Sequence, residues 1–155
     1  MVSNKLASIL KMERISTDEL IEKKEKRTIT EIFRDSGESY FRKVEQEVVK
    51  EISKLRGWVV DCGGGVVTHS QNLALLKENG ILFYLKTSPE IVYKRIRNQS
   101  NRPLLQVQFP LEKIKELLNS RESFYAQADH VIDTDLHSVD DSVNAVLKWL
   151  SHERT

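Results

Sequence analysis

W-V-V-D-C-G-G-G, residues Trp58 to Gly65, is the stretch of sequence that decides the fold of this chain. Its first part, Trp58 to Cys62, is typical of a buried strand, and three consecutive glycines follow it directly. On both sides, short β-branched runs alternate with segments of helical periodicity, which is the pattern of a parallel sheet covered by helices. The sequence therefore predicts an α/β fold.

Further strands are predicted around Ile15, over Ile81 to Leu85 and at Val131 and Ile132. The clearest helix runs from Tyr40 to Leu55, where apolar residues recur every three or four positions, and a separate short helical piece precedes it between Thr30 and Asp35. The same periodicity predicts the remaining helices at Val2 to Leu10, Glu19 to Lys26, Gln71 to Gly80, Thr87 to about Asn98, Leu111 to Leu118 and Val139 to Leu150.

Length and composition favour one compact domain over residues 1–155, because a chain of this size with 39% hydrophobic residues can bury one core. The net charge of +1 provides no field for binding a nucleic-acid backbone. Cys62 is the one cysteine, and the four histidines are not spaced as metal ligands, so neither a disulfide nor a metal site is predicted. No stretch reaches membrane-spanning length.

Two positions offer polar side chains at the ends of predicted elements. Asp18 follows a strand and opens a helix, so it is either a ligand for substrate hydroxyls or an N-cap, and spacing alone favours the cap. Arg42 and Glu45 lie one helical turn apart. They form either an exposed ion pair, which spacing alone favours, or a guanidinium positioned for a carboxylate.

The glycine run, Gly63 to Gly65, is compatible with a turn or with close approach of backbone N–H groups to a ligand, and neither reading is preferred. Cys62 beside it fits a small core residue better than a reactive thiol. The polar segment 97–110 has the composition of a lid loop with Arg102 at its tip, against the alternative of an ordinary mobile loop. Arg95 and Arg121 on the flanking helices point either into the same cleft or to solvent.

Five motifs taken in order give the chain a family resemblance. They are S-T-D-E-L-I-E (Ser16 to Glu22), F-R-K-V-E (Phe41 to Glu45), G-G-G-V-V (Gly63 to Val67), R-P-L-L (Arg102 to Leu105) and I-D-T-D (Ile132 to Asp135). Together they resemble shikimate kinase over nearly the whole chain. The triple glycine paired with F-R-x-x-E sets this resemblance apart from gluconate kinases and nucleoside monophosphate kinases.

The resemblance implies a P-loop kinase fold, a three-layer sandwich with a parallel sheet between helices. It implies transfer of the ATP γ-phosphoryl group to the 3-hydroxyl group of shikimate, which gives shikimate 3-phosphate for the synthesis of chorismate and aromatic amino acids. ATP and Mg²⁺ would be the cofactors and shikimate the small-molecule partner. A cytoplasmic monomer that binds neither nucleic acid nor membrane is expected.

The resemblance also implies residue roles. Asp18 would hold the shikimate hydroxyl groups and act as the catalytic base, and Glu45 would orient Arg42. Arg102 would reach the transferring phosphate from the lid, and Arg95 would pack against adenine. The substrate-binding residues implied in this way are Asp18, Arg42, Gly63, Gly64, Gly65 and Arg121.

Three departures from the family pattern are visible. Ser16 stands where an aspartate usually helps to hold magnesium, and Val139 stands where a proline is usual. The larger departure is that no G-x-x-x-x-G-K-[ST] phosphate loop occurs in the sequence.

The helix Val2 to Leu10 resembles the one that follows this loop in the family. We therefore expect a chain truncated at its N-terminus, without the central first strand between the strands ending near Cys62 and Leu85. Such a gap would leave two buried strand edges unpaired and weaken the fold. Two functions then stay open for this chain. It is either a kinase or a non-catalytic remnant that at most binds shikimate or a partner.

Overall fold

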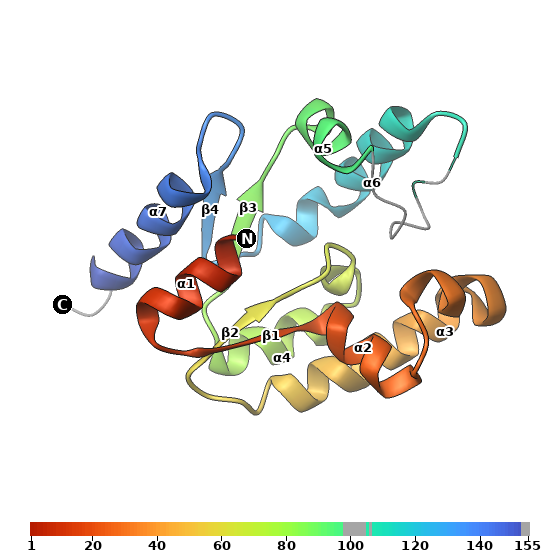
Figure 1. Cartoon of the computed structure of the whole chain (residues 1–155), viewed down its shortest axis with the longest axis horizontal. Helices are drawn as coiled ribbons and strands as arrows, with labels where there is room; N and C mark the ends of the chain where they lie inside the picture. Colours follow the sequence, from red (N-terminus) through yellow and green to blue (C-terminus); the bar gives the residue numbers. More distant parts are fainter. Residues whose placement is uncertain (98–104, 106, 153–155) are drawn as a thin grey trace.

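The structure, a computed structural model, describes residues 1–97, 105 and 107–152. Helices and short strands alternate along this part of the chain (Figure 1). The strands are β1 (Glu13–Ser16), β2 (Trp58–Asp61), β3 (Phe83–Lys86) and β4 (His130–Asp133). The helices are α1 (Val2–Leu10), α2 (Thr17–Glu25), α3 (Ile29–Ile52), the 3-10 helix η1 (Val66–Thr68), α4 (Ser70–Asn79), α5 (Pro89–Ile96), α6 (Pro110–Tyr125) and α7 (Val139–His152).

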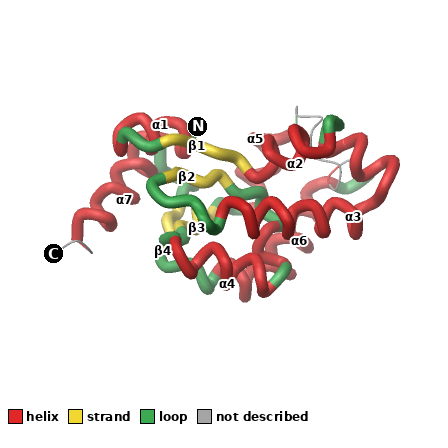
Figure 2. Tube along the Cα trace, turned by 90° about the horizontal axis from the view of Figure 1, so that it is seen from below, coloured by secondary structure: helices red, strands yellow, loops and turns green. Residues whose placement is uncertain are grey.

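The strands form two parallel pairs. β1 pairs with β2 in the register Glu13 to Trp58, and β3 pairs with β4 in the register Phe83 to His130. Figures 1 and 2 show β2 and β3 as the inner strands of the two pairs, and among the described residues no ladder joins them. The predicted α/β architecture with parallel strands flanked by helices is confirmed, and its sheet is present as two separate pairs.

Strand side chains are less covered than is usual in a parallel sheet with helices on both faces. Trp58 of β2 is 38% exposed, Leu85 of β3 is 36% exposed and Val131 of β4 is 44% exposed. These apolar strand side chains are therefore only partly buried.

The main core lies between α2, α3 and α4 on one side of the β1–β2 pair. Its centre is formed by buried residues of the helices, such as Ile21, Ile32 and Val48, and Ile15 and Val60 of the strands pack against it. On the other side α1 and α7 contact each other, and α1 also contacts β1 and β2. This arrangement fixes the carboxyl ends of β1 and β2, where α2 and the glycine run begin.

The long element α3 consists of two helical pieces that meet at Gly37. Its start is set by a capping box in which Thr28 and Glu31 bond each other's backbone N–H groups. The helix then continues to Ile52 with a kink at Gly37, whose φ of 81° lies in the left-handed region. The prediction of separate helical pieces on either side of Gly37 is therefore confirmed, although the second piece ends at Ile52 and not at Leu55.

The search for membrane spans in the described part of the chain found no helix with the length and apolarity to cross a bilayer.

Candidate active site around the triple glycine

The glycine run follows β2 and leads into η1. Gly65 has φ −90° and ψ −9°, and the positive-φ glycines of the described chain are Gly37 and Gly57. Backbone conformation therefore does not explain why Gly65 is a glycine, since other residues adopt these angles freely. The explanation lies in what surrounds the run.

Each glycine of the run faces the side chain of a different predicted site residue. A Cβ atom on Gly63 would lie 2.7 Å from Asp18 Oδ1, and one on Gly65 would lie 2.4 Å from Arg42 Nη1. At Gly64 the nearest atoms would be Tyr125 Oη at 3.3 Å and Arg121 Nη1 at 3.8 Å. The run is thus the floor on which Asp18, Arg42 and Arg121 come together.

The carboxylate side of the site comes from the first turn of α2. Ser16 caps this helix by accepting a hydrogen bond from Glu19 N–H at 3.4 Å, so the preferred reading of Asp18 as the cap is wrong. Thr17 is fully buried, and its Oγ1 accepts a hydrogen bond from Gly63 N–H at 2.9 Å. Thr17 therefore ties the glycine run to α2 and places Asp18 beside it.

The cationic side of the site comes from α3. Arg42 Nη1 donates to Glu45 Oε2 at 2.8 Å, and Arg42 Nη2 donates to Glu38 Oε1 at 3.1 Å. The Glu45 side chain is 2% exposed and that of Arg42 is 20% exposed. The predicted exposed pair of Arg42 and Glu45 is therefore wrong, because this pair is largely removed from water.

Burial raises the pKa of the Glu45 carboxyl, and the neighbouring Arg42 guanidinium opposes that rise. Asp18 and Arg121 also act on Glu45, the first raising and the second lowering its pKa. For Arg42, burial lowers the pKa, but the charges and hydrogen bonds of Glu45 and Glu38 together outweigh it, so the pKa of Arg42 is raised and its guanidinium stays protonated. Glu45 thus senses all three charged side chains of the site.

Arg121 and Tyr125 reach the glycine run from one face of α6, since they are four residues apart on the helix. Tyr125 Oη donates to the carbonyl oxygen of Gly64 at 2.7 Å. Sequence reasoning identified Arg121 but missed Tyr125 and Thr17. The four-residue spacing from Arg121 was an available signal for Tyr125, whereas a threonine at a helix start gives no comparable signal.

Cys62 lies directly before the run and is not a candidate nucleophile. Burial raises the pKa of its thiol to about 12, with the nearby carboxylate of Asp61 acting in the same direction. Asp61 itself accepts hydrogen bonds from Ser3 Oγ at 2.7 Å and Arg14 Nη2 at 3.0 Å.

Two predicted site residues are not placed with this group. Arg95 of α5 donates to the backbone oxygen of Thr134 at 3.1 Å, at the end of β4 and in the I-D-T-D motif. Arg102, and with it most of the predicted lid 97–110, lies outside the described residues.

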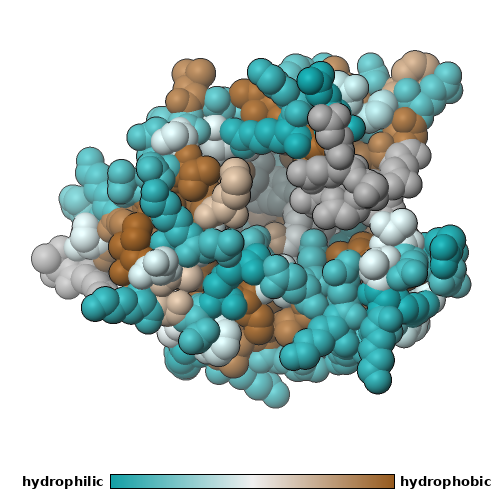
Figure 3. Space-filling view, in the orientation of Figure 1, coloured by the Kyte–Doolittle hydropathy of each residue, from teal (hydrophilic) through white to brown (hydrophobic). Residues whose placement is uncertain are grey.

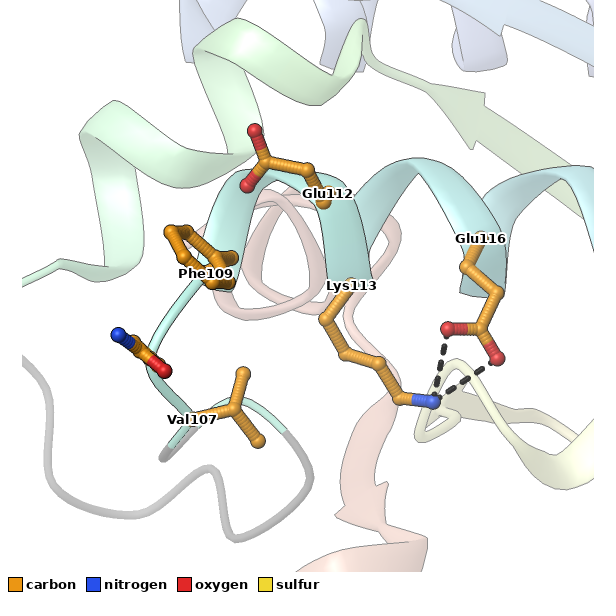
Figure 4. A pocket seen from close by; sticks show the side chains of 6 residues that line it. Val107, Phe109, Glu112, Lys113 and Glu116 are labelled. Atoms are coloured by element: carbon orange, nitrogen blue, oxygen red, sulfur yellow. Dashed lines mark hydrogen bonds and ion pairs between the residues drawn. The ribbon is translucent and has the colours of Figure 1, made fainter.

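A separate open pocket of about 390 Å³ lies where residues 107–109 lead into α6 (Figure 4). Lys113 and Glu116 form an ion pair at its edge, at 2.9 Å. The six residues that line it are Val107, Gln108, Phe109, Glu112, Lys113 and Glu116. None of them belongs to the group around the glycines.

The face shown in Figure 3 is hollowed near its middle, and most residues on this face are hydrophilic.

Within the described residues no group of three His, Cys, Asp or Glu side chains is placed to hold a metal ion. The chemistry that the site offers is thus a carboxylate, two guanidinium groups and backbone N–H groups, a set suited to a hydroxylated anion.

Comparison with known proteins gives consistent matches. The family profile of shikimate kinase matches residues 1–151. The shikimate kinase of Caldanaerobacter subterraneus subsp. tengcongensis is 39% identical over 147 residues, which are 95% of this chain and 86% of the relative. That of Pelotomaculum thermopropionicum is 40% identical over 149 residues, 96% of this chain and 87% of the relative.

Solved structures agree with this result. Shikimate kinase from Acinetobacter baumannii in complex with shikimate superposes with a TM-score of 0.95 at 35% identity, covering 98% of this chain and 86% of that one. Shikimate kinase from Aquifex aeolicus gives a TM-score of 0.85 at 29% identity, covering 99% and 89%. The resemblance read from five short motifs thus extends over the whole described fold, and this chain belongs to the shikimate kinase family.

Proposed function

We propose that this chain provides the shikimate-binding part of a site that transfers the γ-phosphoryl group of ATP to the 3-hydroxyl group of shikimate and forms shikimate 3-phosphate. The observation that carries the proposal is the packing of Asp18, Arg42 and Arg121 against three successive glycines. The substrate class follows from that set, because a ring with one carboxylate and several hydroxyl groups needs both guanidinium and carboxylate partners.

In this proposal Arg42 and Arg121 bind the carboxylate of shikimate, and Glu45 holds Arg42 in place through the 2.8 Å hydrogen bond. Asp18 accepts hydrogen bonds from the ring hydroxyl groups and takes the proton of the 3-hydroxyl group as its oxygen attacks phosphorus. Arg102 neutralises charge on the transferring group from the segment 97–110.

On the nucleotide side, Arg95 packs against adenine in this proposal. Its guanidinium is held at the end of β4 by the Thr134 carbonyl group, so its position is fixed by backbone. Phosphoryl transfer depends mainly on positioning and charge neutralisation, which is why arginines dominate the proposed site.

Magnesium, which the family uses with ATP, does not fit the described residues as a preformed site. The Ser16 hydroxyl oxygen accepts the capping hydrogen bond of α2, and the Asp61 carboxylate is bound by Ser3 and Arg14. Mg²⁺ commonly binds through one or two carboxylates together with phosphates, so the ion would enter with ATP.

The phosphate cradle is the part that the 155 residues do not supply, because the motif G-x-x-x-x-G-K-[ST] is absent from them. In this proposal a parallel strand ending in that loop would occupy the place between β2 and β3, whose facing edges are not paired with each other. The residues described here then form the shikimate half of the site and the adenine contact.

A coupled assay of ADP release with ATP, magnesium and shikimate tests the proposal. It compares the 155-residue chain with a chimera that carries the first strand and phosphate loop of a shikimate kinase in front of Val2. We expect shikimate-dependent ADP release from the chimera alone. A folded chimera that binds shikimate without turnover would support the non-catalytic remnant instead, and one that does not bind shikimate would refute the proposed substrate.

A further inference from the structure

The hydroxyl group of Tyr125 bonds a peptide unit inside the candidate site. Its Oη lies 2.7 Å from the carbonyl oxygen of Gly64. The tyrosine is the last residue of α6, and its ring stacks on that of Tyr84 in β3 with centroids 4.5 Å apart and planes 15° apart. Two elements therefore hold the hydroxyl group in place against the glycine run.

The bonded carbonyl group shares its peptide plane with the N–H group of Gly65. In a trans peptide the C=O and N–H bonds point in opposite directions, so fixing one fixes the other. The described peptide bonds are all trans. The hydrogen bond from Tyr125 therefore directs the Gly65 N–H group away from α6.

The run needs such a restraint because a peptide unit between two glycines rotates more freely than any other. The preceding N–H group, that of Gly63, is already held by Thr17 at 2.9 Å. None of the hydrogen bonds among the described residues uses the N–H group of Gly65. This donor is thus oriented but has no acceptor within the described protein.

We propose that Tyr125 is a positioning residue for substrate binding: its hydroxyl group locks the Gly64–Gly65 peptide plane so that the Gly65 N–H group faces the ligand. The hydrogen bond also polarises the amide, which makes that N–H group a stronger donor. This inference rests on the proposed function for the identity of the ligand. The orientation of the peptide plane can be tested without a ligand.

The chain is well suited to a direct spectroscopic test. It has six glycines, and only Gly64 and Gly65 follow another glycine. With glycine labelled at the carbonyl carbon and at nitrogen, a spectrum that correlates each amide with the preceding carbonyl carbon shows these two amides alone. The amide of Gly65 then reports the carbonyl carbon of Gly64, the atom whose oxygen accepts the bond from Tyr125.

The perturbation is Tyr125→Phe, which keeps the ring and removes the donor. Tyr84→Phe is the matched control, because it makes the same change in the other ring of the stacked pair. We expect an upfield shift of the Gly64 carbonyl carbon in Tyr125→Phe, no shift in Tyr84→Phe, and shikimate binding about fivefold weaker in Tyr125→Phe, as expected for one lost neutral hydrogen bond.

A measurement on the intact side chain covers the case in which Tyr125→Phe does not fold. Incorporation of 3-fluorotyrosine keeps every ring and strengthens the phenol as a donor, so the Gly64 carbonyl carbon should move downfield. An unchanged Gly64 carbon, in either Tyr125→Phe or the fluorinated protein, would overturn the inference. The expected carbon shifts with no shikimate binding in any protein would instead refute the proposed function and leave the positioning geometry intact.

Discussion

Gly65→Ala tests the idea that the glycine run exists to accommodate the site side chains. The new Cβ atom would lie 2.4 Å from Arg42 Nη1 and 2.6 Å from Arg42 Nη2, while the backbone angles of Gly65 suit alanine. Because the clash is with the end of a flexible side chain, the guanidinium group moves and the fold remains. The buried carboxylate of Glu45 then loses its partner.

The expected cost follows from that loss. A charge-assisted hydrogen bond contributes about 1.5 to 3 kcal/mol, and removing one partner of a buried ion pair costs about 3 to 5 kcal/mol. Arg42 is displaced rather than deleted, so we expect a decrease of about 2 to 3 kcal/mol in the free energy of unfolding. Shikimate binding should weaken at least about tenfold, which corresponds to about 1.4 kcal/mol.

The assay is urea unfolding followed by tryptophan fluorescence, with shikimate binding measured by calorimetry. Gly64→Ala is the matched control, because its Cβ atom would meet Tyr125 Oη at 3.3 Å and requires only a small shift. In an Arg42→Ala background, Gly65→Ala should add little further loss, since the clash is gone. Equal effects of the two alanine substitutions in the wild-type background would refute the reasoning.

Three further predictions follow from the same contacts. Folding raises the pKa of the Glu45 carboxyl above its ordinary value of 4.5, so this group stabilises the wild type below pH 4.5 and the stabilisation is lost as the pH rises. Glu45→Gln has no such loss, so its free energy of unfolding should increase relative to that of the wild type as the pH rises above 4.5. Parallel pH profiles of urea unfolding for the two proteins would contradict this. The thiol of Cys62, with its pKa raised to about 12, should react with an aromatic disulfide at pH 8 far more slowly in the native chain than in the chain in urea; equal rates would show an accessible thiolate. Ser16→Ala should lower the free energy of unfolding by about 0.5 to 1 kcal/mol through loss of the cap of α2, whereas Ser16→Asp should retain it; equal losses would exclude the capping role.

Much of the fold was predictable because hydrophobic periodicity is local. The spacing of apolar residues predicts α1 at Val2–Leu10 and comes within a residue or two of the bounds of α4 at Ser70–Asn79. Gly37 shows the limit of that reasoning. A glycine suggests a break in a helix, and Gly37 makes one inside α3, but only tertiary packing decides the direction in which the second helical piece continues.

The site was predictable in its residue types but not in its energetics. Spacing shows that Arg42 and Glu45 lie one turn apart, yet it does not show that the Glu45 side chain is 2% exposed, because burial depends on tertiary packing around α3. Sequence likewise left Asp18 as either a cap or a ligand for substrate hydroxyls, and only the backbone path shows that Ser16 is the cap and that Asp18 lies beside Gly63. Sequence alone does not explain why three glycines are needed, because the explanation depends on which side chains lie against each of them.

The most direct test of the account is calorimetric titration of shikimate, and separately of its methyl ester, into the 155-residue chain, with a cooperative thermal melt to establish that the protein is folded. We predict binding of shikimate and much weaker binding of the ester, because Arg42 and Arg121 would bind a charged carboxylate. A folded chain that binds neither compound, or binds both equally, would contradict the assignment of this site to shikimate.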